Sequence, residues 1–157
     1  MAKLSAHGRE IGRIEYLAKQ VAVFEDGHLL VNYGDGWKLH KKFKAGVDPA
    51  AGLERRRVEQ AEFLAANPAF AEYRRLVHEA APASKRFALT QAVELLGDDV
   101  DGLWSELQQS WGGAADLDLS LEDCEALARA YAAAGEEARA RKAAQMHAAT
   151  VLEAVGA

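Results

Sequence analysis

The feature of this sequence that most constrains its fold is a change of hydrophobic period near Asp48. Before it, residues 10–44 alternate apolar and polar side chains as half-buried β-strands do. Turn sequences separate the alternating runs, at Asp26-Gly27 and at Gly34-Asp35-Gly36. After it, apolar residues recur at helical spacing. Asp48-Pro49 combines a preferred N-cap with proline at the first helical position, so we expect it to start the first helix.

The strand patterns predict an antiparallel meander of three to four strands within residues 1–47. Its last strand, Trp37 to Lys44, has the most regular alternation in the chain. Because side chains of a strand point alternately to its two faces, this strand is expected to have a cationic face and a largely apolar one. We expect Lys38, His40, Lys42 and Lys44 on the first face, and Trp37, Leu39, Lys41 and Phe43 on the second.

Residues 48–157 predict a bundle of about six helices. Strands followed by helices indicate an α+β fold, with a basic meander over 1–47 and an acidic helical bundle over 48–157. The expected helix starts are Asp48, Asn67, Ser84, Asp98, Ser120 and Glu136. An amphipathic face is formed by Val100, Leu103, Trp104, Leu107 and Trp111, and Gly112-Gly113 behind it reads as a flexible joint.

The last two predicted helices carry a familiar spacing. Residues 127–135, Leu-Ala-Arg-Ala-Tyr-Ala-Ala-Ala-Gly, are followed by Ala140. This segment resembles one tetratricopeptide unit, in which small residues let two helices touch and glycine permits the turn between them. The resemblance implies a helical hairpin over 121–155 that turns at Gly135. A generic alanine-rich helical pair is the alternative, since the motif has no second copy.

Charge divides at the same boundary as the hydrophobic period. Residues 1–57 contain 11 Lys and Arg against 7 Asp and Glu, and residues 58–157 contain 8 against 17. The net charge of −5 is therefore the sum of +4 and −9. A split of this kind predicts two surfaces with different partners, or is a chance difference between two small parts of a chain.

Motifs that carry chemistry are incomplete. Asp98 to Gly102 lacks the first and last oxygen ligands of a calcium loop, and His78-Glu79 lacks the second histidine of a zinc-protease helix. The glycine pairs lack the spacing of a phosphate-binding loop. The five histidines are scattered along the sequence, and Cys124 lies on an amphipathic stripe. We therefore predict no catalytic, cofactor-binding or metal-binding residues.

The composition predicts a soluble, cytoplasmic protein. The first residues have no apolar signal-peptide core, and no stretch of the sequence approaches the roughly 20 apolar residues of a membrane span. A single cysteine excludes a disulfide within the chain.

The leading functional hypothesis is a non-enzymatic interaction protein that binds nucleic acid or a nucleoprotein complex through its basic β-face. The alternative is an inhibitor from a phage or mobile element, of the anti-CRISPR or anti-defence type, that acts through acidic helices. A third is an enzyme with a dispersed site. The exposed lysines also have a simpler reading, as charges that keep an edge strand from pairing with other chains. The predicted binding residues are Lys38, His40, Lys42, Lys44, Arg55, Arg56, Arg57, Trp37 and Tyr33.

Overall fold

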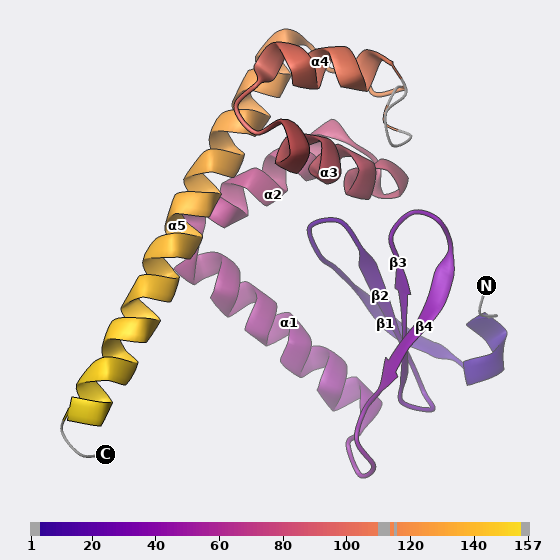
Figure 1. The fold of residues 1–157 in the computed structure, drawn as a ribbon. Coiled ribbons are helices and arrows are strands. Elements are labelled where there is room, and N and C mark those ends of the chain that lie inside the picture. Colours follow the sequence, from indigo (N-terminus) through magenta and orange to yellow (C-terminus); the bar gives the residue numbers. More distant parts are fainter. Residues whose placement is uncertain (1–3, 110–113, 115, 155–157) are drawn as a thin grey trace.

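The computed structural model describes residues 4–109, 114 and 116–154, and it confirms the α+β prediction (Figure 1). A four-stranded antiparallel sheet in the order β1-β2-β3-β4 precedes the helices. The strands are β1 (Glu10–Glu15), β2 (Gln20–Phe24), β3 (His28–Asn32) and β4 (Trp37–Lys42). The α-helices are α1 (Pro49–Ala66), α2 (Pro68–Ala80), α3 (Arg86–Leu96), α4 (Val100–Gln108) and α5 (Leu121–Ala154). Short 3-10 helices are η1 (Leu4–His7) and η2 (Ala83–Lys85).

Helix α1 packs on one face of the sheet, where Val21, Val23, Leu29, Val31 and Ile14 form a core with Leu53. Two glycines permit this close approach. A Cβ atom on Gly12 would lie 2.8 Å from a methyl group of Leu53, and one on Gly52 would lie 2.6 Å from the ring of Phe43. The first helix and the sheet therefore share a core.

The opposite face of the sheet is covered by η1 and by side chains of the strands themselves. Ala22, Phe24 and Leu30 are buried there, and the indole of Trp37 packs against them. The guanidinium of Arg13 lies over that indole, 4.8 Å from its centre. His7 of η1 contacts Phe24, with 5.9 Å between ring centroids.

A β-bulge in β4 changes which side chains share a face. Leu29 pairs with Lys41 while Leu30 pairs with Leu39, so His40 is an extra residue. Lys38 lies opposite Val31 and Lys42 opposite His28, and these two β3 residues point to opposite faces. The prediction that Lys38 and Lys42 share one face is therefore wrong, because an inserted residue shifts the alternation.

Helices α2 to α5 enclose a second core. Its members include Tyr73, Val77, Leu89, Val93, Leu103, Leu107, Cys124 and Leu127. Leu17, in the turn between β1 and β2, packs against the same core, so this turn joins the sheet to the helices.

Residues 121–154 form one continuous helix, and the prediction of a hairpin that turns at Gly135 is wrong. One glycine costs about 1 kcal/mol inside a helix, which is too little to end an alanine-rich segment. For this reason five α-helices occur in the described residues, rather than about six. Trp111 and the predicted joint at Gly112-Gly113 lie outside those residues. None of the described helices has the length and apolar character to cross a membrane.

Helix α5 supplies the N-terminal cap of α2. The Glu137 carboxylate accepts hydrogen bonds from the backbone N–H groups of Ala69 and Phe70, at 2.9 and 3.0 Å. Asn67 is the residue before α2, as predicted, but its side chain makes no cap hydrogen bond. Its amide instead donates to the Phe63 carbonyl and accepts from Arg141. A distant acid therefore satisfies the free N–H groups of this helix end.

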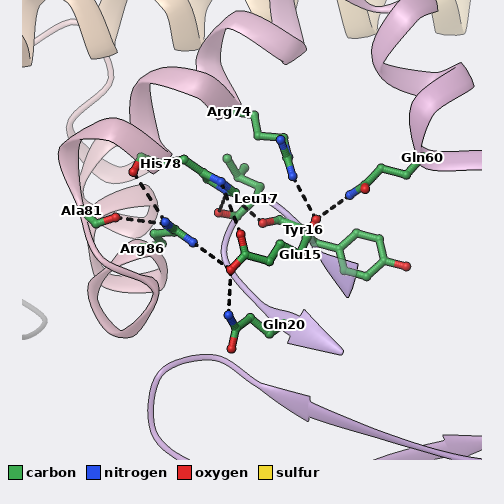
Figure 2. Close-up of polar contacts among 9 residues, drawn as sticks. All are labelled: Glu15, Tyr16, Leu17, Gln20, Gln60, Arg74, His78, Ala81 and Arg86. Carbon is green, nitrogen blue, oxygen red and sulfur yellow. Dashed lines mark hydrogen bonds and ion pairs between the residues drawn. The ribbon is translucent and has the colours of Figure 1, made fainter. Parts of the chain in front are cut away.

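The turn between β1 and β2 is held by polar side chains from three helices (Figure 2). The Glu15 carbonyl accepts from Gln60 of α1 at 2.6 Å and from Arg74 of α2 at 3.0 Å. His78 of α2 lies within hydrogen-bond distance of the next two carbonyls, at 3.0 and 3.2 Å. Backbone groups of the turn thus find partners on elements far away in sequence.

The Glu15 carboxylate completes this interface. It accepts a hydrogen bond from Gln20 at 2.7 Å and lies 3.5 Å from Arg86 of α3. The hydrogen bond from Gln20 lowers the pKa of Glu15, and the charge of Arg86 acts in the same direction against the effect of burial. Arg86 also donates to the carbonyls of Ala81 and His78 at the end of α2.

Replacing Glu137 tests the cap of α2. Glu137→Ala leaves two N–H groups without their acceptor, so we expect a loss of about 1 kcal/mol in unfolding free energy. Urea denaturation measures this loss. Glu136→Ala removes the exposed neighbouring acid and is the matched control, expected to stay within about 0.5 kcal/mol of the parent. Equal losses in both variants would contradict the assigned cap.

The pKa of His78 predicts a pH dependence of stability. Burial, and then the charges of Arg86 and Arg74, lower this pKa in the folded state. The unfolded chain therefore takes up the proton first, near pH 6.5. The contribution of His78 to the unfolding free energy is fully present above about pH 6.5 and decreases as the pH falls from there.

We expect His78→Gln to lose less unfolding free energy than the parent protein between about pH 6.5 and pH 5. Denaturant titrations at several pH values measure the two slopes. His147→Gln changes an exposed histidine of α5 and should keep the parent slope. A His78→Gln slope equal to the parent's would refute the assignment.

Candidate nucleic-acid interface

The structure separates the cations that the sequence groups together. Lys38 forms an ion pair with Asp35 at 2.7 Å, and Arg55 forms one with Glu59 at 3.4 Å. Arg57 donates to the backbone carbonyl of β1 at Arg13, at 3.2 Å. These three predicted binding residues already have partners within the chain.

The two predicted aromatic residues also lie apart. Trp37 lies on the sheet face away from α1 and has Arg13 over its ring. Tyr33 meets Phe87 of α3 edge-on, with 5.2 Å between ring centroids. Lys42 and Lys44 are exposed, and no ion pair with either is found among the described residues. Lys44 lies beyond the end of β4.

Three cations and a histidine from the β1–β2 turn, β4 and α1 do come together, and we refer to them as the basic cluster: Lys19, His40, Lys41 and Arg56. Burial, and then the positive charges of the other three, lower the pKa of His40. Lys19 lies over the rings of Tyr16 and Tyr33, at 5.3 and 6.0 Å from their centroids. The bulge in β4 contributes to this arrangement, because it puts Lys41 on the α1 side of the sheet opposite Leu29.

An aromatic hollow adjoins the basic cluster, with a volume of about 420 Å³. It lies between the β1–β2 turn and helices α1 and α2. Arg56 belongs to both features and lies 3.4 Å from the hydroxyl of Tyr16, which lines the hollow and has Lys19 of the cluster over its ring. Its lining comprises Tyr16, Leu17, Arg56, Glu59, Gln60, Phe63, Leu64, Phe70 and Arg74.

Two features of the hollow favour a planar ligand with hydrogen-bond acceptors. Phe63 and Phe70 meet edge-on in its wall, with 5.5 Å between ring centroids. A terminal nitrogen of Arg74 donates a hydrogen bond to the Glu15 carbonyl. The Nε atom of Arg74 is buried without a hydrogen-bond partner. Because this nitrogen is shielded from solvent, an acceptor atom of a ligand could reach it only after a shift of the Arg74 side chain.

The binding residues predicted from the sequence include His40, Arg56 and Tyr33 but not Lys19, Lys41 or the two phenylalanines. Lys41 was assigned to the largely apolar face because the bulge leaves no clear mark in the sequence. The phenylalanines lie on two helices whose relative placement depends on tertiary packing. The only local signal was Tyr16 and Lys19 flanking the turn between two predicted strands.

One group of side chains among the described residues has the geometry to hold a metal ion. It consists of His7, Asp26 and His28. These residues lie on the far side of the sheet from α1, next to Phe24. Sequence reasoning treated the histidines as scattered.

Comparisons of the chain with protein-family models, with curated proteins and with solved structures found no significant match.

Proposed function

We propose that this protein is a non-enzymatic binding protein for single-stranded nucleic acid, free or within a nucleoprotein complex. The observation that carries this proposal is the continuity of the basic cluster with the aromatic hollow through Tyr16 and Arg56. Single strands are bound where cations follow the phosphates and aromatic side chains receive unstacked bases.

The basic cluster and the aromatic hollow would contact different parts of a nucleotide. Lys19 and Lys41 would contact phosphate oxygens, and Arg56 lies where the cluster and the hollow meet. A base would enter the hollow against Phe63 and Phe70, with an acceptor atom toward the guanidinium group of Arg74. A paired base inside a duplex cannot reach such a hollow, so the geometry favours single strands.

The polar groups at the β1–β2 turn support a binding role over a catalytic one. His78, Glu15 and Arg86 are partly buried titratable groups at the β1–β2 turn, which forms one side of the hollow. His78 and Arg86 form hydrogen bonds with backbone carbonyls, and the Glu15 carboxylate accepts one from Gln20 and lies 3.5 Å from Arg86. These contacts fix the turn that holds Tyr16 and Lys19. The three groups therefore have a structural role that explains their placement.

Charge reversal in the basic cluster tests the phosphate contacts. We expect the double variant Lys19→Glu, Lys41→Glu to bind a fluorescent single-stranded oligonucleotide at least about tenfold more weakly. The slope of log affinity against log salt concentration should become less negative by about 1 for each lysine removed. Fluorescence anisotropy at several salt concentrations measures both quantities.

The matched control is Lys142→Glu, which makes the same charge change on the exposed part of α5. It should reduce the affinity much less than either cluster substitution made singly. Binding that does not weaken with salt, or that Lys142→Glu weakens equally, would contradict a specific role for the cluster.

Removing an aromatic wall tests the hollow. Phe63→Ala should weaken single-strand binding by about 1–3 kcal/mol, the usual value of one base–aromatic stack, without changing the salt slope. Phe87→Ala is the control, because these two phenylalanines are similarly exposed, at 40 % and 38 %. If Phe87→Ala gave the same loss, or Phe63→Ala none, the hollow would not be the base site.

A further inference from the structure

The hairpin between β2 and β3 brings three metal-ligating side chains together with η1. Asp26 and His28 flank Gly27 of the turn, and His7 comes from the end of η1. The Nδ1 atoms of His7 and His28 lie 3.0 and 2.8 Å from the same oxygen of Asp26, Oδ2. All three ligand atoms lie within 4.8 Å of one another.

The two nitrogen–oxygen separations are close to the spacing of ligands around a small divalent ion. Zinc binds imidazole nitrogen and carboxylate oxygen at about 2.0–2.1 Å, so neighbouring ligand atoms are roughly 3 Å apart. The present distances therefore allow coordination with small side-chain movements. The two imidazole rings lie 4.5 Å apart between centroids, with an angle of 44° between their planes.

The site is partly built before any ion binds. The other carboxylate oxygen of Asp26, Oδ1, accepts the backbone N–H of His28 at 2.9 Å, which fixes the carboxylate in the turn. His7 packs on Phe24, and the His7 and His28 side chains are only 17 % and 26 % exposed. Burial opposes ionisation, but the hydrogen bonds from His28 and His7 lower the pKa of Asp26 to about 2. The carboxylate is therefore charged at neutral pH.

A positive and a negative side chain lie next to the site. Lys42 lies opposite His28 in the β3–β4 pair, on the same face of the sheet. The Glu25 carboxylate lies against Gly8, which follows His7 in the chain. The flexible stem of Lys42 lets its ammonium group turn toward water when a cation binds.

We propose that His7, Asp26 and His28 form a binding site for a divalent first-row transition metal such as Zn²⁺ or Co²⁺. Two imidazole nitrogens and one carboxylate oxygen suit these ions better than Mg²⁺ or Ca²⁺, which prefer oxygen ligands. An ionised carboxylate only accepts hydrogen bonds, so each Nδ1 carries its hydrogen while no ion is bound. On binding, each neutral ring coordinates through Nδ1 and carries its hydrogen on Nε2.

The bound ion would fasten η1 onto the β2–β3 hairpin. Three protein ligands leave at least one coordination position for water or for a ligand from a partner. The site is separate from the basic cluster, since it lies on the other face of the sheet. Metal binding at this site does not depend on nucleic-acid binding at the basic cluster.

The test is metal titration of the tag-free, full-length protein after treatment with a chelator. We expect Co²⁺ to give visible ligand-field absorption that saturates at one ion per chain, and Zn²⁺ to displace it. Calorimetry gives the Zn²⁺ affinity, and thermal unfolding should show a higher Tm with Zn²⁺, because the ion binds the folded state.

The most informative variant is His28→Asn. Its amide can still donate a hydrogen bond to Asp26, so the turn retains its contact, but a good metal ligand is lost. We expect Zn²⁺ affinity to fall by roughly 100-fold or more, since even changes around metal ligands cost about 10- to 100-fold. His7→Asn and Asp26→Asn should act in the same direction, and circular dichroism verifies that each variant is folded.

His147→Asn, on the exposed part of α5, is the matched control and should keep the parent affinity. The proposal is overturned if the parent protein gives no saturable Co²⁺ spectrum. It is also overturned if His28→Asn, folded as the parent is, binds Zn²⁺ equally well, or if His147→Asn loses as much affinity.

Discussion

Backbone carbonyls in the turn between β1 and β2 must find hydrogen-bond donors, and the rest of the structure depends on how they do so. Gln60, Arg74 and His78 reach them from α1 and α2, and Arg86 connects the Glu15 carboxylate to the end of α2. A buried carbonyl without a partner is costly, so these contacts specify one orientation of the sheet against the helices. The arrangement in Figure 2 is thus a polar joint between two apolar cores.

The same joint determines the geometry of the candidate interface. It fixes the backbone of the turn that carries Tyr16. Leu17 of this turn packs against the helical core, and Lys19 lies over the rings of Tyr16 and Tyr33. Arg74 donates one hydrogen bond to the turn and also lines the hollow, and its Nε is buried without a hydrogen-bond partner. A feature needed for folding therefore also fixes side chains that line the hollow, among them Tyr16, Leu17 and Arg74.

The two faces of the sheet have separate chemistry. The α1 side carries the basic cluster and borders the aromatic hollow, whereas the opposite side carries Trp37 with Arg13 above it and the histidine pair around Asp26. The bulge at His40 decides which lysine lies on which face: Lys41 lies on the α1 side and Lys42 on the other, the reverse of their places in an uninterrupted strand. An uninterrupted strand would have placed Lys38 and Lys42 together.

The sequence by itself determined the α+β order, the strands, and the starts of α1 and α2 at Asp48-Pro49 and Asn67-Pro68, because these depend on local periodicity and on proline chemistry. It did not determine the bulge in β4, the continuity of α5 through Gly135, or the capping of α2 by Glu137. Nor did it reveal that His7 meets His28, or that Phe63 meets Phe70 beside Arg56. Each of these depends on residues brought together by packing. Only the tertiary structure decided them, because local pattern carries no information about which distant side chains become neighbours.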